Sequence, residues 1–176
     1  ETAVAVLESG VDVINDISAF AFDPALLDVL VQYRPGYVLM HCQGVPGTMQ
    51  QNPHYNDVVS EVTAFFEEKM NVLVNAGFPE ENILLDPGIG FGKKMEHNLA
   101  LMAHPEAWER LGRPSLMALS MKSVFNDLLG LPVESRGPAT QTATALCYTR
   151  GYAWHRVHDA RAASQALRLA DAFMNA

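Results

Sequence analysis

Five short apolar runs recur along the chain, and each of them leads into polar residues. The runs lie at residues 11–14, 37–40, 83–85, 115–119 and 152–154. They are continuous rather than alternating, which is typical of strands that are covered on both faces of a sheet. The pattern therefore predicts five buried strands whose carboxyl ends carry polar side chains.

Segments with helical spacing lie between these runs. Over residues 56–76 apolar side chains recur every three or four positions, and Gly77 ends the pattern. Further helices are predicted over residues 1–9, 98–111, 139–150 and 160–175. Alternation of strands and helices predicts a parallel sheet in an α/β fold. Ligands of such folds bind at the carboxyl ends of the strands, so the polar residues there form the candidate site.

The stretch "LLDPGIGFGKK" (residues 84–94) has the composition of a phosphate-binding loop but not the spacing. A P-loop requires a glycine five residues before Gly92, where proline stands, and Ser or Thr after Lys93, where a second lysine stands. A dinucleotide motif that starts at Gly88 would need glycine at position 93. The stretch is instead interpreted as a strand tip, which a proline ends directly after the carboxylate of Asp86.

Composition narrows the class of partner and the compartment. A net charge of −8 and a pI near 5.1 argue against a nucleic-acid or anionic-membrane partner. No apolar stretch approaches the roughly 18 residues of a membrane span, and the first residues do not form a signal peptide. Cys42 and Cys147 are far apart in apolar surroundings, as expected of two reduced thiols. We therefore predict a cytoplasmic protein whose partner is neither nucleic acid nor an anionic membrane.

Length limits the fold further. A complete (β/α)₈ barrel takes about 250 residues, whereas this chain has 176 residues and opens directly on a predicted helix. We interpret it as a single domain over residues 1–176 that holds the last five strands of a TIM barrel and their helices, and lacks the amino-terminal strands.

Five motifs at the strand ends resemble one enzyme family. They are "INDIS" (14–18), "LMHCQGVPGTMQ" (39–50), "LDPGIGFGK" (85–93), "SMK" (120–122) and "RVHD" (156–159). In this order they resemble dihydropteroate synthase, the folate-pathway transferase that joins a dihydropterin diphosphate to 4-aminobenzoate and is the target of sulfonamides. The resemblance implies a pterin-binding domain of TIM-barrel fold and a homodimer formed through the late helices.

The resemblance also implies the residues that bind the pterin. Asp86 would anchor it, because one carboxylate can accept two parallel N–H bonds. Asn15 would contact the adjacent ring edge, and Lys122 would contact the pterin carbonyl and a ring nitrogen. Ile17 and Met40 would form an apolar shelf beneath the ring; without the resemblance, both are interpreted as core residues.

The other two substrate groups are assigned in the same way. The resemblance implies Arg156 and His158 as the diphosphate-binding pair, and the planar guanidinium can also stack on the pterin ring. Phe91 and Ser123 would bind 4-aminobenzoate, with a helix start at Ser123 that supplies further N–H donors. Lys122, Arg156 and His158 are therefore the predicted catalytic residues.

No metal site held by the protein itself is predicted. The histidines outside the motifs, which are His54, His97, His104 and His155, lack the i, i+4 spacing of a zinc pair. The sequence also contains no Ser or Cys nucleophile motif. The resemblance implies Mg²⁺ that is held mainly through the substrate diphosphate and residues upstream of Glu1. Mobile loops, a magnesium-binding Asn and a further pterin-binding Asp would also lie upstream, so the chain as given is expected to be inactive.

Four further residues within or next to these motifs are interpreted separately. Lys93 and Lys94 are predicted to be solvated, and His41 either satisfies a buried backbone group or belongs to the site. Met121 stands where the family usually has Arg. If residues 120–122 are extended, alternate side chains face opposite ways, so Lys122 keeps its direction while Met121 faces the packing.

Two other functions stay open. The first is a pterin-binding methyltransferase domain that acts on methyltetrahydrofolate, although "SMK" and "RVHD" argue against it because a methyl transfer releases no diphosphate. The second is a noncatalytic pterin-binding homologue or fragment.

Overall fold

The computed structural model describes residues 1–176, which form five strands and eight α-helices. The strands are β1 (Val13–Asp16), β2 (Gly36–Met40), β3 (Ile83–Asp86), β4 (Leu116–Met117) and β5 (Trp154–His155). All strand pairs are parallel, in the orders β1-β2-β3 and β4-β5. An isolated parallel bridge between Leu85 and Ser115 joins the two groups. The prediction of five parallel strands in an α/β fold is confirmed.

The helices agree with the predictions in four places and differ in three. They are α1 (Thr2–Glu8), α2 (Leu26–Tyr33), α3 (Val58–Asn75), α4 (Met95–Ala103), α5 (Glu106–Glu109), α6 (Val124–Leu129), α7 (Gly137–Thr149) and α8 (Ala160–Met174), with 3₁₀ turns at Glu80–Asn82 and Val133–Ser135. Neither α2 nor α6 was predicted. The single helix predicted over 98–111 is wrong: Pro105 disfavours helical backbone at His104, and α4 ends there.

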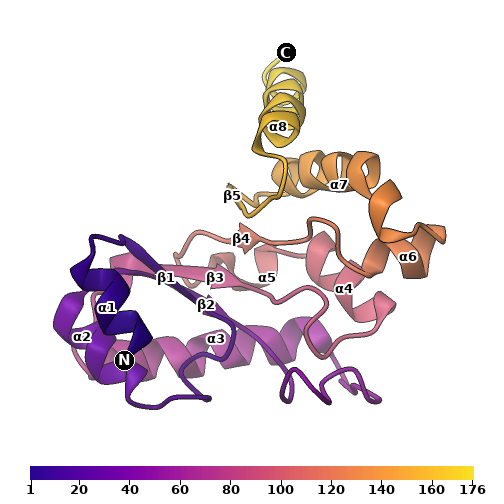
Figure 1. The fold of residues 1–176 in the computed structure, drawn as a ribbon. Helices are drawn as coiled ribbons and strands as arrows, with labels where there is room; N and C mark the ends of the chain where they lie inside the picture. The colour runs from indigo at the N-terminus through magenta and orange to yellow at the C-terminus, as the bar shows by residue number, and fades with distance from the viewer.

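The two faces of the sheet have different roles. Side chains of Tyr37, Leu39, Ile83 and Leu85 are almost fully buried in the main core, together with the apolar face of α3. Figure 1 shows α3 running beneath β1, β2 and β3. On the other face, Val38, Leu84, Leu116 and Ala118 form only a small apolar cluster. This second face is therefore the one with room for a ligand.

The outer strands do not meet. β1 pairs only with β2, and β5 pairs only with β4, so these five strands form an open sheet and do not close a barrel by themselves. Val13 of β1 is 49% exposed. The expectation that every strand is covered on both faces is therefore wrong for β1, which has a neighbour on one side only.

The carboxyl-terminal helices extend away from the sheet. α7 and α8 pack against each other, and Figure 1 shows α8 standing clear of the rest of the chain. Between them lies a groove of about 380 Å³ lined by apolar and small side chains. Leu146 is 59% exposed there, and Phe173 is 79% exposed. This arm thus presents an apolar surface that the chain itself does not cover.

Two remaining predictions concern helices and thiols. None of the helices combines the length and hydropathy needed to cross a membrane. Cys42 is half-buried, Cys147 is buried, and both are free thiols.

Candidate active site

The strand register places predicted pterin residues on one face. Met40 of β2 pairs with Asp86 of β3, and Asn15 of β1 pairs with Val38. Side chains two residues apart on a strand share a face, so Asn15, Met40 and Asp86 all lie on the side of the small apolar cluster. Met40 is buried, whereas Asn15 is exposed at the unpaired strand.

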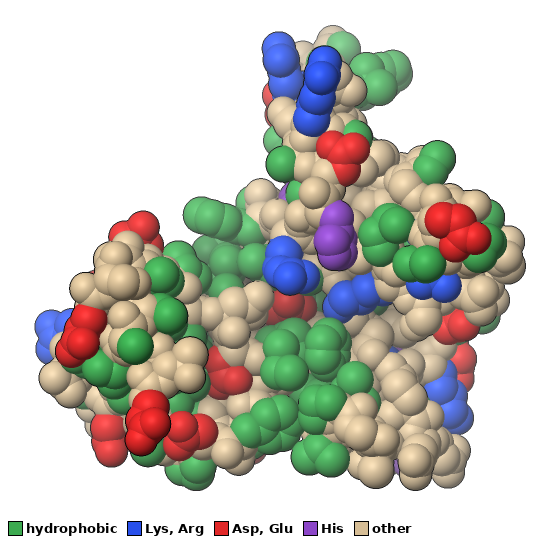
Figure 2. Space-filling model, viewed as in Figure 1, with side chains coloured by type: hydrophobic (Ala, Val, Ile, Leu, Met, Phe, Trp, Pro, Cys, Tyr) green, Lys and Arg blue, Asp and Glu red, His purple; other side chains and the backbone are tan.

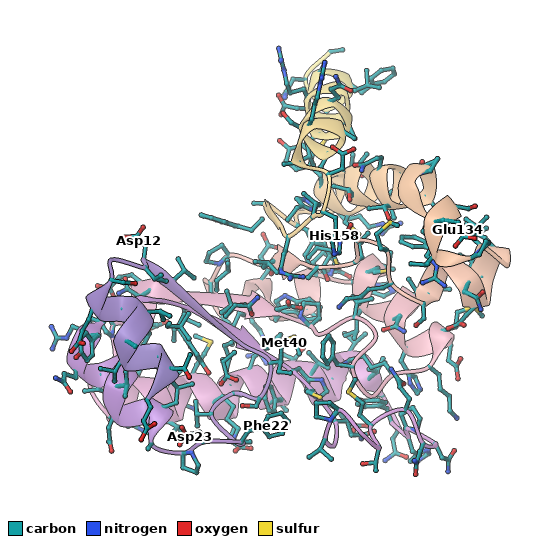
Figure 3. The ribbon with its side chains drawn as sticks, viewed as in Figure 1. Asp12, Phe22, Asp23, Met40, Glu134 and His158 are labelled. Carbon is teal, nitrogen blue, oxygen red and sulfur yellow. The ribbon has the colours of Figure 1, made fainter.

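β5 brings the predicted anion-binding residues to the same side. Leu116 pairs with Trp154, and the Arg156 N–H continues the ladder by donating to the Met117 carbonyl at 3.0 Å. Arg156 therefore lies on the face of Leu116, which is also the face of Asp86. Figure 3 labels Met40 and His158 on one viewed face of the molecule, and in the same view Figure 2 shows a histidine and basic side chains above a hydrophobic patch.

Two aspartates at strand tips, Asp16 on β1 and Asp86 on β3, differ in what their oxygens bind. The carboxylate of Asp16 accepts bonds from the Ser18 N–H and hydroxyl, the Phe20 N–H and the Tyr37 hydroxyl. The carboxylate of Asp86 accepts only one protein hydrogen bond, from the N–H of Gly88 at 2.7 Å. Since a carboxylate has about four acceptor positions, Asp16 is saturated and Asp86 retains capacity for a ligand.

The surroundings of Asp86 are unusual for a carboxylate. It is 2% exposed, and burial raises the pKa of its carboxyl above the ordinary value. The Gly88 N–H and the positive charges of Lys122, Lys93 and Arg156 act in the opposite direction. Three cations thus face one buried acid, an arrangement typical of a binding site rather than of a core.

Lys122 connects the Asp86 side of the site with Phe91. Its ammonium donates a hydrogen bond to the Ile89 carbonyl and lies 4.7 Å from the centroid of the Phe91 ring. Burial lowers the pKa of Lys122 to about 8, while Asp86 acts to raise it. The half-buried Phe91 ring is thereby fixed beside the cation.

The loop at residues 88–92 passes so close to its neighbour that it requires glycine. Gly88 has a φ of +68°, and a Cβ there would lie 1.9 Å from the carbonyl oxygen of His41. Gly92 has a φ of +63°, and a Cβ would lie 2.4 Å from the carbonyl oxygen of Gln43. Any side chain at these positions would displace backbone.

Polar side chains hold the same loop on its other sides. The Gly90 N–H donates to Asn98 Oδ1 at 2.8 Å, and the Tyr55 hydroxyl donates to the Gly92 carbonyl at 2.8 Å. Gln50 donates to the Gly90 carbonyl from the loop that follows β2. The loop is therefore fixed before any ligand binds.

The predicted exposure of Lys93 is wrong. Lys93 is 3% exposed, and its Nζ lies 2.9 Å from His41 Nδ1, 3.1 Å from the Gly88 carbonyl oxygen and 3.0 Å from that of Phe91. Lys94 is exposed, as predicted. The loop curls around the Lys93 side chain, which fills its centre. His41 pairs with this ammonium and so belongs to the site's framework.

Burial governs the protonation of this pair. It lowers the pKa of Lys93 to about 7, with Cys42 and Asp86 acting to raise it. It also lowers the pKa of His41 to about 3, and the charge of Lys93 adds to that shift. His41 is therefore neutral near pH 7, and its Nδ1 can accept a hydrogen bond from Lys93.

His158 is oriented by a serine. Its Nδ1 lies 2.9 Å from Ser120 Oγ, and its backbone N–H donates to the same oxygen at 3.3 Å. Both Arg156 and His158 are exposed at the strand tips. A cavity of about 360 Å³, lined in part by His158, opens at the starts of α7 and α8. The remaining ring nitrogen of His158 is thus available to a ligand.

Residues 120–122 are not extended, which corrects the expected reason for the direction of Lys122. Met121 has a φ of +62° and forms a turn. Its N–H donates to Thr140 Oγ1 at 3.2 Å, and its carbonyl accepts from Arg136 at 2.9 Å. Lys122 still points to the site, but it does so because of the turn.

The other predicted residues lie at the margins. Ile17 is half-buried in the turn after β1, and Ser123 is exposed at the residue before α6, where the expected helix start occurs. The described residues include no cluster of three His, Cys, Asp or Glu placed to share a metal ion. The described residues therefore do not fit a magnesium site that is held by the protein itself.

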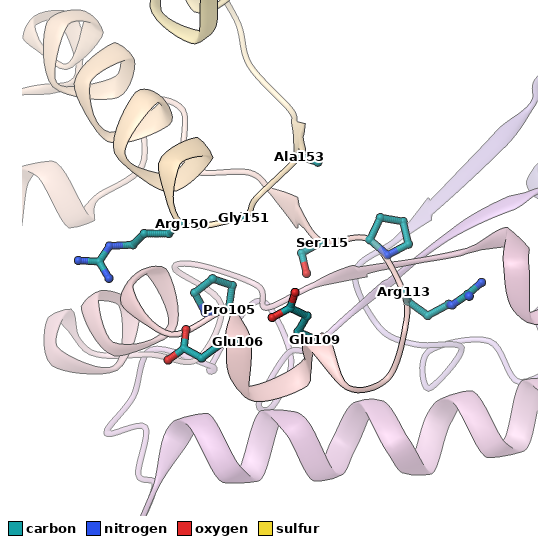
Figure 4. Close-up of a pocket in the computed structure, with 9 residues that line it drawn as sticks. Pro105, Glu106, Glu109, Arg113, Ser115, Arg150, Gly151 and Ala153 are labelled. Carbon is teal, nitrogen blue, oxygen red and sulfur yellow. The ribbon is translucent and has the colours of Figure 1, made fainter. Parts of the chain in front are cut away.

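A separate cavity of about 220 Å³ lies at the opposite end of β4. Figure 4 shows Glu106, Glu109, Arg113 and Ser115 around it. It contains none of the predicted site residues.

Comparisons with known proteins identify the family of the chain. The family model described as pterin binding enzyme matches residues 1–158. The chain belongs to the pterin-binding enzyme family. Family relatives named dihydropteroate synthase include that of Haemophilus influenzae, 37% identical over 95% of this chain and 60% of the relative. That of Neisseria meningitidis serogroup B is 40% identical over 93% of this chain and 59% of the relative.

Solved structures of family members also superpose closely. The dihydropteroate synthase of Yersinia pestis, in a sulfonamide drug complex, matches with a TM-score of 0.94 at 31% identity, over 98% of this chain and 63% of that one. The Xanthomonas albilineans enzyme in complex with 7,8-dihydropteroate matches with a TM-score of 0.90 at 35% identity, over 99% and 63%. The chain thus spans about 60% of the length of its relatives.

Proposed function

We propose that this chain is the pterin-binding, carboxyl-terminal part of a dihydropteroate synthase of folate biosynthesis. The observation that carries the proposal is Asp86, a buried carboxylate at a strand tip with unused acceptor capacity and three cations facing it. A pterin offers two parallel N–H donors that such a carboxylate can accept.

The pterin would lie on the inner face of the sheet. Asp86 accepts from its ring N–H and amino group, Asn15 binds the adjacent edge, and Lys122 donates to the carbonyl and a ring nitrogen. Met40 and Ile17 provide the apolar shelf. The shared face of Asn15, Met40 and Asp86 supports this arrangement.

The diphosphate would lie towards β5, where Arg156 and His158 supply positive charge and a donor. Ser120 holds Nδ1 of His158, so that Nε2 faces the anion. The arylamine nitrogen attacks the pterin methylene carbon while the C–O bond to diphosphate breaks, and the nitrogen then loses one proton to water. The protein positions the reactants and stabilises the departing charge, without a covalent intermediate.

The 4-aminobenzoate would bind between Phe91 and Ser123, next to the ammonium of Lys122. A related structure from Xanthomonas albilineans is described with 4-aminobenzoic acid, which supports this substrate class. Mg²⁺ would bind through the diphosphate of the substrate. We place the enzyme in the cytoplasm, as a single pterin-binding domain over residues 1–176 that holds the last strands of a TIM barrel.

The partner would be a second copy of the chain. The groove between α7 and α8 carries exposed Leu146, Leu169 and Phe173, a surface that a homodimer would cover. Catalysis by residues 1–176 alone is not expected, because Arg156, His158 and Asn15 lie exposed at an open sheet.

Binding of the diphosphate group distinguishes a synthase, whose substrate carries it, from a methyltransferase, whose reaction releases no diphosphate. In fluorescence titrations, Arg156→Ala should weaken binding of the hydroxymethylpterin diphosphate by about 10- to 100-fold, the equivalent of one or more charge-assisted hydrogen bonds. Plain hydroxymethylpterin should lose less than about threefold, and Arg168→Ala on exposed α8 serves as the control. Equal losses for both ligands would mean that Arg156 is a stacking surface, and the diphosphate assignment would fail.

A further inference from the structure

Two adjacent lysines close the glycine-rich loop, and only one of them is buried. Lys94 points to solvent, whereas Lys93 is 3% exposed at the centre of the loop. Its Nζ contacts His41 Nδ1 at 2.9 Å and three backbone carbonyl oxygens, those of Phe91 at 3.0 Å, Gly88 at 3.1 Å and His41 at 3.4 Å. The proposed chemistry assigns no role to this cation.

The carbonyl partners of Lys93 depend on it to different degrees. The Gly88 oxygen also accepts from the Phe91 N–H at 3.0 Å. The Phe91 oxygen has no other hydrogen-bond partner in the structure. Leaving a partly buried carbonyl without a donor is costly, so removal of the ammonium should let the Phe91 peptide turn away to find another partner.

The same contacts reach both proposed subsites. The peptide N–H of Gly88 donates to Asp86 Oδ1 while the Gly88 carbonyl binds Lys93, so one side chain fixes the residue that orients the pterin anchor. Lys93 also fixes the Phe91 backbone, and the Phe91 ring is the one that lies against the Lys122 ammonium.

We propose that Lys93 is a positioning residue for substrate binding: by joining the end of β2 at His41 to the loop carbonyls of Gly88 and Phe91, it sets the geometry of Asp86 and Phe91. Lys93 itself touches no substrate. The inference rests on the proposed function, because Asp86 and Phe91 are binding residues only under that proposal.

Stability alone does not account for the arrangement. Burying an ammonium is costly, and a buried charge can often be replaced by a hydrophobic side chain of similar volume without loss of stability. Methionine has a similar length to lysine and lacks the charge, so Lys93→Met isolates the hydrogen bonds from the packing. Lys94→Met makes the same change one residue away on the exposed side.

The experiment titrates the purified chain and both variants with 6-hydroxymethylpterin, followed by pterin fluorescence. Lys93→Met should weaken binding at least tenfold while its melting temperature stays within a few degrees of the parent. Lys94→Met should bind within twofold of the parent. Hydrogen exchange in a peptide over residues 87–92 should rise only in Lys93→Met.

A second measurement uses the parent chain alone, in case Lys93→Met does not fold. The lysines are Lys69, Lys93, Lys94 and Lys122, so a ¹⁵N-lysine side-chain spectrum is simple. At pH 6, below the lowered pKa of about 7, Lys93 should give a slowly exchanging ammonium signal that shifts on addition of the pterin. The Lys94 signal should exchange fast and stay unchanged.

The outcomes distinguish the two proposals. If the parent does not bind the pterin, the proposed function fails. If the parent binds and Lys93→Met binds as tightly as Lys94→Met, the function stands and the positioning role is wrong. A Lys93 signal that exchanges fast, or does not change at saturating pterin, would likewise overturn the positioning role.

Discussion

Around Asp86 the chain fixes its site through buried contacts on every side, whereas around His158 it relies on one serine and a pair of two-residue strands. Lys93, Asn98 and Tyr55 hold the loop after β3. β4 and β5 pair over two residues each, and only an isolated bridge joins them to β3. The proposed pterin half of the site is therefore preorganised by the chain itself.

The proposed diphosphate half has fewer supporting contacts within the chain. β5 has one neighbour, and the apolar groove of α7 and α8 is open to solvent. Under the proposed function, this difference separates ligand affinity from turnover. We expect affinity for the pterin ring to survive in this chain, whereas chemistry at the diphosphate needs an environment that excludes water.

The largest expected effect separates these two properties. Product formation by the purified chain, with Mg²⁺ and both substrates, should be below about 1% of the rate of the full-length Haemophilus influenzae enzyme, because loss of one charge-stabilising group typically costs about 10²- to 10³-fold. The same preparation should still bind hydroxymethylpterin. Comparable rates would show that residues 1–176 form a complete active site. Binding without turnover is the result expected both for an incomplete synthase and for a noncatalytic homologue.

A matched pair of glycines tests how firmly the loop is held. Gly88→Ala should lower the free energy of unfolding by about 3 kcal/mol or more, because left-handed backbone costs roughly 1–2 kcal/mol and the His41 carbonyl must also move. Gly130 has nearly the same φ, +67°, but nothing within 4 Å of a Cβ, so Gly130→Ala should cost only about 1 kcal/mol. Urea unfolding measures both, and equal losses would mean that the loop can relax.

A charged residue placed in the groove between α7 and α8 tests the proposed dimer. If α7 and α8 form the dimer, Phe173→Asp should weaken self-association at least about 100-fold, since burial of each Phe contributes ~1.5–3 kcal/mol and a two-fold interface contains it twice. Light scattering after size-exclusion chromatography gives the mass. Ala172→Asp, exposed but outside the groove, should remain dimeric. A parent that is monomeric at all concentrations would contradict the dimer.

The smallest effect concerns the cost of burying Asp86. Burial raises its folded-state pKa above 3.8, so the carboxyl favours folding below that pH and this contribution is lost as pH rises through the folded pKa. At pH 7 Asp86→Asn should therefore melt higher than the parent, by roughly 2–4 °C for each kcal/mol regained. The difference should vanish below pH 4. A lower melting temperature at pH 7 would mean that the Asp86 charge is net stabilising.

The sequence predicted the central strands β2 and β3 best, because both are buried along almost their whole length. The continuous apolar runs of β2 and β3 predicted strands that are covered on both sides, and the polar residue after each run marked the ligand edge. The break at Pro105 could also have been predicted from the restriction that proline imposes on the preceding residue. In α2 the exposed Asp28 and Gln32 lie four positions apart, which is a helical signal that the prediction missed. α6 has only six residues and gave no usable signal.

The burial of Lys93 and the left-handed backbone of Met121 could not be derived from the local sequence pattern. Consecutive lysines point in different directions, and which one turns inward depends on loop carbonyls that come together only in the fold. The left-handed backbone of Met121 is held by Arg136 and Thr140, which are 15 and 19 residues away. A glycine-rich loop followed by lysine is the signal that could have suggested an internal cation.

The central claim is that Asp86 anchors a pterin, and the most direct test is a fluorescence titration of hydroxymethylpterin with the parent and with Asp86→Asn. Asparagine keeps the size but presents a donor to the donors of the pterin, and each hydrogen bond to a charged group contributes about 1.5–3 kcal/mol. The account predicts at least about 100-fold weaker binding by Asp86→Asn, while Asp127→Asn on α6 binds like the parent. Equal affinity of Asp86→Asn and the parent would contradict it.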